Sequence, residues 1–512
     1  MHFLKTLFAL SLVVSMFLSS NSSWGKEANP NKTPLLRRAP IIGLIQEGRL
    51  PILVKGREKS KVRIQFREAD SDKVSATSWY PLKSKNDFTA NLWLSEVKPA
   101  TSYEYQVEFE KAPPTDWKKF RTLPASSQPG KLRFAFSSCL REKYRPHFIF
   151  GFLKEESLDF MALLGDNIYG DYDGNLNDID KIKRDRGYRE KLLQEGEPLP
   201  REDSVLESFR QKYQRNFDKH FQEMSAALPI VSTWDDHDFG EDGSDGTYPY
   251  KEISKQVFNE TFPVQPYLEP EGGLYYRFSA ANVDFFVIDS RWYKSPMGPD
   301  GPEHTLLGEK QLQWLLEGLK KSEEAGHPFK IILSSMSWSD TGGDRSRDKK
   351  WFDNWEGYAE ERKKVLDFTR THQIRGVFTL SGDQHFPSFN VLNWEESMKP
   401  LQQSPNSVLF SLASNPTALF DLSASPLDYK RAVGETLPPG VTHPGIREIY
   451  RIPWAIKGHP SEPYHAKKIA SIYALVETDT ASPVPSVTVT FKELDFEEGK
   501  LKELYKIQIQ AP

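Results

Sequence analysis

The run Asp159-Phe160-Met161-Ala162-Leu163-Leu164 leads directly into Gly165-Asp166-Asn167-Ile168-Tyr169. A short apolar run that ends in a polar turn is typical of a buried strand in an α/β sheet. Residues 229–233 precede Asp235-Asp236-His237-Asp238 in the same way, and 377–380 precede Gly382-Asp383-Gln384-His385. Ligands of α/β sheets bind beyond the carboxyl ends of strands. The three polar stretches are therefore predicted to meet in one site.

The only cysteine, Cys139, follows a fourth apolar run at 132–136. From residue 131 onward, apolar runs alternate with helical patterns, which predicts a layered α/β domain. Six strands are expected in its first part, at 132–136, 159–164, 229–233, 283–288, 330–333 and 377–380. Four later strands, at 408–412, 471–477, 486–491 and 504–509, are expected to complete a second sheet. The fold class is thus an α/β/β/α sandwich of two sheets with helices outside.

One helix is predicted to bury an aromatic stripe made of Phe209, Tyr213, Phe217 and Phe221, which are four residues apart.

A smaller β-domain is expected before this sandwich, at about 40–125. Residues 61–67 and 103–109 alternate apolar and polar side chains, as half-buried strands do. Pro99-Ala100-Thr101-Ser102-Tyr103 is compatible with the tyrosine corner of a fibronectin-like β-sandwich, or with an ordinary turn before an aromatic strand residue. The Pro- and Ser-containing stretch 124–130 then reads as a linker.

Length and composition limit the class of protein. A chain of 512 residues exceeds what one hydrophobic core usually serves, so two domains are expected. Lys5 and the apolar run 7–18 predict a secretory signal peptide over residues 1–23, and an N-terminal membrane anchor is the alternative. The mature protein is expected to be exported, periplasmic or extracellular, without a membrane span. A formal net charge of −4 with no dominant basic stripe argues against nucleic acid as the main partner.

The residue types at the predicted strand ends are those of an asymmetric metal pair. An Asp that follows Gly at a strand end can bridge two cations, and Asp166 is the candidate, although Gly-Asp alone would favour a helix cap. Thiolate, phenolate and imidazole from Cys139, Tyr169 and His385 suit a soft or trivalent ion. A buried thiol or core tyrosine is the usual fate of the first two when they stand alone. Asp383 lies two residues from His385 and can face the same metal.

The stretch Asp235-Asp236-His237-Asp238 crowds four ionisable groups, which is difficult to maintain without cations. Asp236 is assigned to the metal and His237 to the phosphate or the leaving group. Asp235 or Asp238 could orient the imidazole.

Together these motifs resemble the PhoD-like alkaline phosphatases and phosphodiesterases, within the calcineurin-like metallophosphatase superfamily. The resemblance runs from the small β-domain to Gly382-Asp383-Gln384-His385-Phe386 and implies a catalytic domain over 131–512. It implies iron (Fe³⁺) held by Cys139, Asp166, Tyr169 and His385, and calcium held with the help of Asp166, Asp236 and Asp383. It also implies that His237 contacts the phosphate, and Arg141, Ser335, Trp338 and Tyr358 are candidates for the site wall.

Two features depart from the family pattern. Arg37-Arg38 lies beyond the apolar run, which favours general rather than twin-arginine export. Extra carboxylates in 238–246 would favour a hard divalent ion or form a solvated loop, so another divalent metal remains open.

The predicted activity is hydrolysis of phosphate monoesters or diesters, in small-molecule or polymeric substrates, by a metal-activated hydroxide or water, in a monomer. His237 and Asp166 are the expected catalytic groups. The alternatives are phospholipase or phosphotriesterase activity on the same scaffold, and a non-catalytic protein that binds a carbohydrate or another envelope ligand.

Overall fold

The computed structural model describes residues 35–171, 194–196, 199, 201–298, 304–339, 353–395, 398–430, 441–443, 446–451, 469–496 and 498–511. The predicted signal peptide, 1–23, lies outside the described residues.

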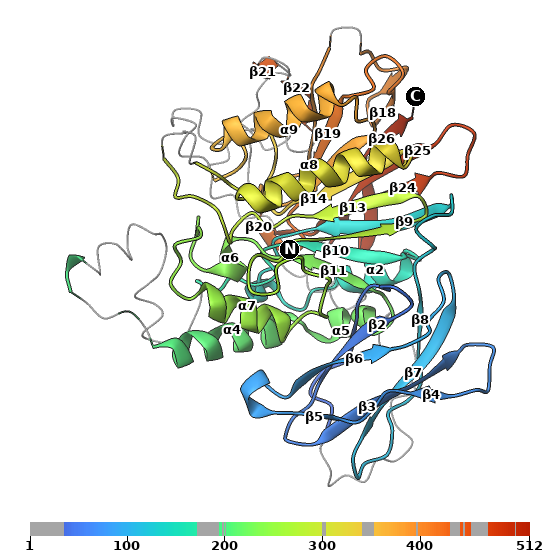
Figure 1. The fold of residues 1–512 in the computed structure, drawn as a ribbon, viewed down its shortest axis with the longest axis vertical. Helices are drawn as coiled ribbons and strands as arrows, with labels where there is room; N and C mark the ends of the chain where they lie inside the picture. Colours follow the sequence, from blue (N-terminus) through green and yellow to red (C-terminus); the bar gives the residue numbers. More distant parts are fainter. Residues whose placement is uncertain are drawn as a thin grey trace, which may run out of the picture.

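Two eight-stranded sheets form the centre of the fold (Figure 1). The first has the order β11 (Ile230–Thr233), β10 (Phe160–Leu164), β9 (Lys131–Ser137), β24 (Ile472–Asp479), β25 (Ser486–Asp495), β26 (Lys500–Gln510), β18 (Ser407–Ser411) and β17 (Gln402–Ser404). Its strands β9, β10 and β11 are parallel neighbours. Their carboxyl ends therefore lie along one edge.

The second sheet has the order β12 (Tyr276–Ala280), β13 (Val283–Val287), β14 (Phe329–Leu333), β15 (Val377–Ser381), β19 (Leu419–Ser423), β16 (Ser388–Leu392), β22 (Ile446–Arg451) and β21 (Val441–His443). Strands β13, β14, β15 and β19 are parallel. A small pair, β20 (Tyr429–Lys430) with β23 (Ile469–Ala470), accompanies the two large sheets.

The parallel strands β10, β13, β14 and β15 are buried on both faces, which is why their sequences are mostly apolar. In β10, Phe160, Ala162 and Leu164 pack into the core between the two sheets, whereas Met161 and Leu163 pack against the helices outside. The helices of that outer face are α2 (Ile149–Glu155), α4 (Glu202–Asn216), α5 (Lys219–Ser225), α6 (Asp236–Phe239) and α7 (Lys251–Asn259). Alternate side chains of β10 thus face opposite layers, because successive residues of a strand point to opposite faces of the sheet.

The outer face of the second sheet is covered by α8 (Glu309–Glu324) and α9 (Ala359–Thr371), which lie on the opposite side of the sheets from α4, α5 and α7 (Figure 1). The predicted α/β/β/α sandwich is therefore confirmed. Among the described residues, no helix is long and apolar enough to span a bilayer.

Residues 35–121 form two smaller sheets with their own core. One contains β1 (Ile41–Ile42), β2 (Leu50–Lys55) and β6 (Thr89–Leu94), and the other β4 (Ser75–Ala76), β3 (Lys61–Glu68), β5 (Tyr80–Pro81), β7 (Ser102–Phe109) and β8 (Lys118–Arg121). The backbone N–H of Lys98 donates to the hydroxyl of Tyr103 at 2.9 Å. This contact is that of a tyrosine corner rather than of an ordinary turn.

Two predictions about the larger domain were wrong in detail. The late strands β24, β25, β26 and β18 extend the first sheet next to β9, and the second sheet is built from the middle of the chain. Local sequence could not reveal this because strand partners are chosen by long-range packing. The aromatic stripe spans two helices, because the Asp218 side chain accepts the backbone N–H groups of His220 and Phe221 and so begins α5.

Candidate metal centre

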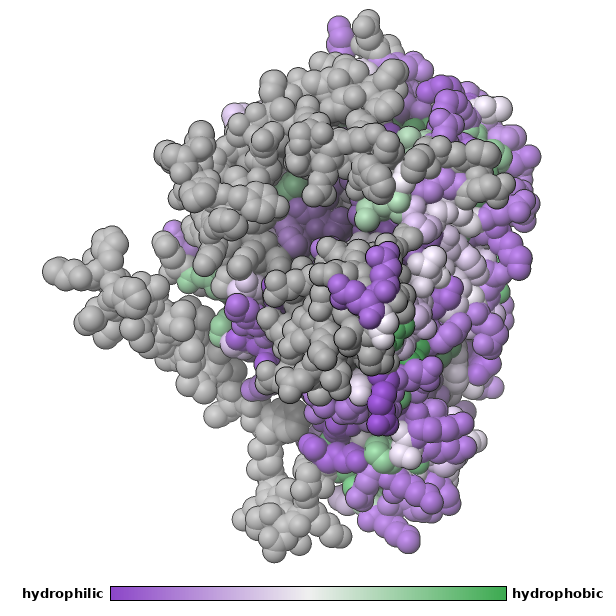
Figure 2. All heavy atoms as spheres, turned by 90° about the vertical axis from the view of Figure 1, so that its left-hand side faces the viewer, coloured by the Kyte–Doolittle hydropathy of each residue, from purple (hydrophilic) through white to green (hydrophobic). Residues whose placement is uncertain are grey.

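The predicted site residues converge at the carboxyl ends of strands from both sheets. Cys139 follows β9, Asp166 follows β10, and Asp235 and Asp236 follow β11. Asp383 and His385 follow β15, from the second sheet. Helix α6 lies on the left of Figure 1, and that side has a hollow lined with hydrophilic residues in Figure 2. The two sheets therefore present their polar ends to a common place.

Glycines allow the loops to approach closely. A Cβ atom on Gly165 would lie 2.5 Å from the Cβ of Asp235, and one on Gly382 would overlap the side chain of Ser138. The Ser138 hydroxyl accepts the backbone N–H of Asp383 at 3.0 Å. The glycine before each aspartate is thus required by the contact between loops.

Four of the predicted ligands have left-handed backbones. Their φ angles are 64° for Cys139, 51° for Asp166, 67° for Asp383 and 58° for His385. Such conformations cost a non-glycine residue of order 1–3 kcal/mol and persist where the surroundings enforce them. Other non-glycine residues of the described chain also have positive φ, but four ligands with such backbones at one site indicate that side-chain placement there outweighs local stability.

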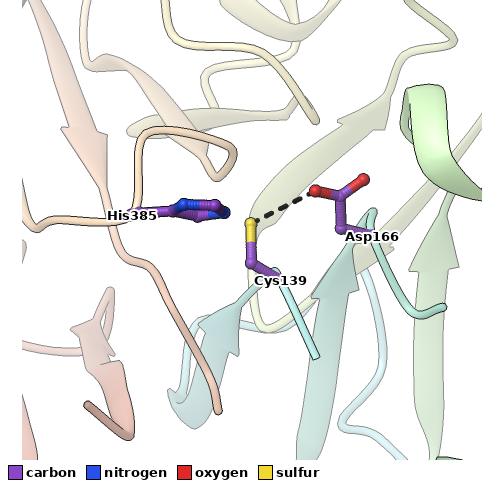
Figure 3. A group of neighbouring side chains, drawn as sticks. All are labelled: Cys139, Asp166 and His385. Carbon is purple, nitrogen blue, oxygen red and sulfur yellow. Dashed lines mark hydrogen bonds between the residues drawn. The ribbon is translucent and has the colours of Figure 1, made fainter. Parts of the chain in front are cut away.

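One end of the site brings together Cys139, Asp166 and His385, whose candidate ligand atoms lie within 4.8 Å of one another. In Figure 3 the sulfur of Cys139 lies between the His385 ring and the Asp166 carboxylate, with Sγ 3.5 Å from Oδ2 of Asp166. The hydroxyl of Tyr169 lies 3.1 Å from Nε2 of His385. The structure therefore groups all four residues that were expected to hold the trivalent ion.

The other end is formed by carboxylates. Asp166, Asp235 and Asp383 form a second group within 4.8 Å. Asp235 takes the place beside Asp383 that the sequence had suggested for Asp236. The difference follows from the start of α6, because Asp235 is its N-cap and Asp236 its first helical residue. Asp236 accepts the backbone N–H groups of His237 and Gly243, and it groups with Asp166 and His237.

The imidazole of His237 is held by a residue that the sequence did not single out. Nδ1 of His237 lies 2.6 Å from Oδ1 of Asp171. Neither Asp235 nor Asp238 takes this role, as had been suggested. Asp238 instead accepts the hydroxyl of Tyr213 at 2.7 Å. It also accepts the backbone N–H groups of Asn167 and Asp235 and the side-chain amide of Asn167, so Asp238 ties the motif loops together.

Arg291, which is fully buried after β13, organises the carboxylate end. Its Nε donates to Oδ1 of Asp235 at 2.7 Å, and its Nη1 donates to Oδ2 of Asp353 at 2.7 Å. The Ser335 hydroxyl donates to the same Asp235 oxygen at 2.8 Å. These hydrogen bonds fix the Asp235 carboxylate through its Oδ1 atom. Its other oxygen, Oδ2, is buried with no hydrogen-bond partner in the described part of the chain.

Buried carboxylates dominate the electrostatics of the site. Burial and neighbouring carboxylates raise the pKa values of Asp166 and Asp383 well above the usual range. Burial raises the pKa of Asp235 to about 6, although Arg291 opposes the rise. Burial and the charge of Asp166 likewise raise the pKa of the Cys139 thiol. A bound cation would reverse these shifts, because it favours the ionised forms.

The surroundings shift the pKa values of His385 and His237 in opposite directions. Burial and the charge of His237 lower the pKa of His385 to about 3, so this imidazole stays neutral and suits a metal ligand. Burial opposes protonation of His237, but the carboxylates of Asp171, Asp236 and Asp166 raise its pKa well above normal.

The donor set fits a pair of cations. Besides Oδ2 of Asp235, Oδ1 of Asp166 is buried and has no hydrogen-bond partner among the described residues. Unsatisfied buried carboxylate oxygens are costly and rare unless something binds them. Because Asp166 belongs to all three candidate groups, it is the residue that could bridge two ions.

The four candidates for the site wall are all buried. Arg141 is buried, with its guanidinium carbon 5.6 Å from the centroid of the Tyr169 ring. Ser335 supports Asp235, as described. Trp338 is fully buried and stacks on Trp355 at 4.1 Å, and the hydroxyl of Tyr358 donates to the carbonyl of Ser295. Trp338 and Tyr358 belong to the hydrophobic core cluster that α8 and α9 cover.

Sequence reasoning missed Asp171, Arg291 and Asp353. Arg291 follows the end of β13 by a few residues, so the rule that identified the other strand ends could have found it. Asp171 begins a highly charged stretch, and nothing in its spacing distinguishes it from its neighbours.

The two-sheet sandwich, with polar residues from both sheets at one edge, defines a fold of the metallophosphatase type. A family model described as PhoD-like phosphatase matches residues 134–436, and the chain belongs to this family. Alkaline phosphatase D of Bacillus subtilis (strain 168) is 27% identical over 295 residues, which cover 52% of this chain and 48% of that protein. The match thus spans about half the length of this curated relative.

Two solved structures share the fold. A structure of PhoD superposes with a TM-score of 0.68 at 18% identity, over 94% of this chain and 92% of that one. Purple acid phosphatase PPD1 from yellow lupin (Lupinus luteus) gives a TM-score of 0.58 at 9% identity, over 93% and 75% of the two chains.

Proposed function

We propose that the protein is a metal-dependent phosphoesterase that hydrolyses phosphate monoesters or diesters at a two-cation site. The observation that carries this proposal is the position of Asp166, whose carboxylate is shared by all three candidate metal groups. Membership of the PhoD-like phosphatase family supports it. The substrate class is a small molecule, or an ester group of a polymer that the polar hollow can admit.

Cys139, Asp166, Tyr169 and His385 would hold one cation, for which thiolate and phenolate donors favour iron as Fe³⁺. Asp166, Asp235 and Asp383 would hold the second, for which oxygen donors favour calcium. When bound, the pair would supply Lewis acidity to a phosphoryl oxygen and lower the pKa of a water molecule.

The remaining residues of the site would orient other groups and supply a proton. Asp171 engages Nδ1 of His237, so Nε2 is the nitrogen through which the ring would reach a phosphate or leaving-group oxygen. In hydrolysis a water oxygen forms the new bond to phosphorus, the bond to the leaving oxygen breaks, and the imidazolium gives its proton to that oxygen. Arg141, whose guanidinium lies over the Tyr169 ring, would face the negative ester, and Arg291 would keep Asp235 in position.

Export belongs to the same proposal. The Lys5-containing apolar start of the chain favours removal of a signal peptide and action in the periplasm or outside the cell, as a monomer. A free thiol in such a compartment is protected when it is buried or bound to metal, and Cys139 is fully buried.

The test is elemental analysis of protein purified without chelator, together with hydrolysis of p-nitrophenyl phosphate and bis-p-nitrophenyl phosphate with and without added calcium. We expect about one iron per chain and calcium-dependent turnover, and the preferred ester would distinguish monoesterase from diesterase. His237→Ala and Asp166→Asn should each abolish turnover. Wild-type protein without metal and without turnover, even after reconstitution, would overturn the proposal in favour of a non-catalytic binding protein.

A further inference from the structure

The last turn of α4 lies against the loops that carry two of the proposed ligands. The side chain of Asn216 is fully buried, and its Nδ2 donates to the carbonyl of Leu140 at 2.7 Å and to that of Asn167 at 2.5 Å. Leu140 follows Cys139, and Asn167 follows Asp166. One amide group therefore joins the two loops, each at the residue immediately after a ligand.

The orientation of this amide is fixed by its partners. Both Nδ2 contacts are carbonyl oxygens, which only accept, so both amide protons are used and the remaining atom is the oxygen. That oxygen, Oδ1, lies 2.6 Å from Nε2 of His147, which must therefore donate to it. His147 is fully buried, and its Nδ1 lies 2.6 Å from Oδ2 of Asp428. The imidazole holds the amide in the one orientation that serves both loops.

The hydrogen-bond network of Asn216, His147 and Asp428 also contacts the loop that carries Cys139. The backbone N–H of Asp428 donates to the carbonyl of Cys139 at 3.3 Å. The loops also meet directly, because the N–H of Cys139 donates to the carbonyl of Gly165 at 3.2 Å, and that of Leu140 to Asp166 at 2.8 Å. Asn216 thus adds a second bridge between two segments that are already paired.

We propose that Asn216, oriented by His147, is a positioning residue that sets the distance between the Cys139 sulfur and the Asp166 carboxylate, and with it the affinity of the thiolate end for its cation. This inference rests on the proposed function. Its physical reason is that Cys139 and Asp166 both have left-handed backbones, which need external contacts to hold them. Partners that orient metal ligands typically change metal affinity by about 10-fold to 100-fold when they are removed.

The first test uses Asn216→Leu, which keeps a similar shape and removes both donors without adding charge. Metal-free protein is titrated with Co²⁺ alone, and both the dissociation constant and the cobalt–thiolate absorption are recorded. We expect Co²⁺ to bind at least 10-fold more weakly to the variant, with a weaker thiolate band. Val205→Ala is the matched control, because Val205 is a buried residue of the same helix whose truncation should lower the unfolding temperature and leave the Co²⁺ affinity within twofold of wild type.

A second pair of variants keeps the inference testable if Asn216→Leu does not fold. His147→Leu removes the donor to Asn216 and should weaken Co²⁺ binding, whereas His147→Gln retains an N–H donor and should restore most of the affinity. Equal affinity in wild type and all folded variants would overturn the inference while leaving the proposed function intact. A wild-type chain that took up no cation would overturn both.

Discussion

Nδ1 of His237 lies 2.6 Å from Oδ1 of Asp171, although His237 belongs to α6 and Asp171 precedes α4 in the chain. The contact gives the imidazole a fixed orientation and a carboxylate partner. It also explains why the pKa of His237 is raised in spite of burial.

Asp171→Asn is expected to lower kcat on the order of 10²-fold, with a smaller change in KM, because the leaving oxygen would lose an oriented proton donor. The sign of the pH effect follows from the raised pKa of His237. Without the carboxylate that pKa falls, the imidazolium deprotonates earlier, and the alkaline limb of the kcat profile moves to lower pH. The measurement is kcat against pH. Asp203→Asn, an equal charge change at an exposed ion pair, should leave the profile unchanged. An unchanged dependence of kcat on pH in Asp171→Asn would show that His237 does not act as the general acid.

The shared position of Asp166 predicts unequal metal losses. Cys139→Ala should lose the cation of the thiolate end and retain the other, whereas Asp166→Asn should lose both, because its carboxylate serves both groups. Elemental analysis after dialysis gives the number of each metal per chain. The idea of a bridging carboxylate fails if Asp166→Asn retains both metals in wild-type amounts.

Chelation should destabilise the protein more at pH 8 than at pH 5. In the metal-free protein the folded pKa values of Asp166, Asp235 and Asp383 lie above their unfolded values, so the folded state binds more protons and its stability falls as pH rises through them. A cation removes this penalty and contributes about 2.7 kcal/mol at a concentration 100 times its Kd. Thermal unfolding with and without chelator at both pH values measures the difference. An equal effect at the two pH values would contradict the prediction.

Arg291→Met is expected to lower the free energy of unfolding by about 3–5 kcal/mol, because it leaves the buried Asp235 without its cation, whereas Asp353 keeps its ion pair with Lys294. Arg201→Met removes an exposed pair with Asp203 and should cost no more than about 1 kcal/mol. Urea unfolding of both variants under identical metal conditions measures the contrast. Similar small losses in the two would show that Arg291 is not needed to hold the carboxylates.

Much of the fold was predictable because its strands are short, continuous apolar runs with polar ends. The runs at 132–136, 159–164, 229–233 and 377–380 correspond to β9, β10, β11 and β15. The assignment of β24, β25 and β26 to the first sheet was not predictable. An apolar pattern indicates that a strand is buried, but it does not identify the neighbouring strand.

The site residues also divide into those that local sequence could predict and those that it could not. Cys139, Asp166, Tyr169 and His385 were identified by residue type and by position after a strand, and the structure brings them together. Asp171 gave no local signal, and the place of Asp235 rather than Asp236 beside Asp383 depends on where α6 begins. One residue of shift at a helix start changes which side chain points back toward the strand end.

The α/β class, the order of the strand ends and the chemical types of the ligands followed from the amino-acid sequence, because they depend on local periodicity and on donor chemistry. Three relationships emerged only from the folded chain: Asp235 stands beside Asp383, Asp171 holds His237, and Asn216 joins the loops of Cys139 and Asp166. These contacts join residues far apart in the chain, and their distances are set by how two sheets and α4 pack rather than by any sequence spacing.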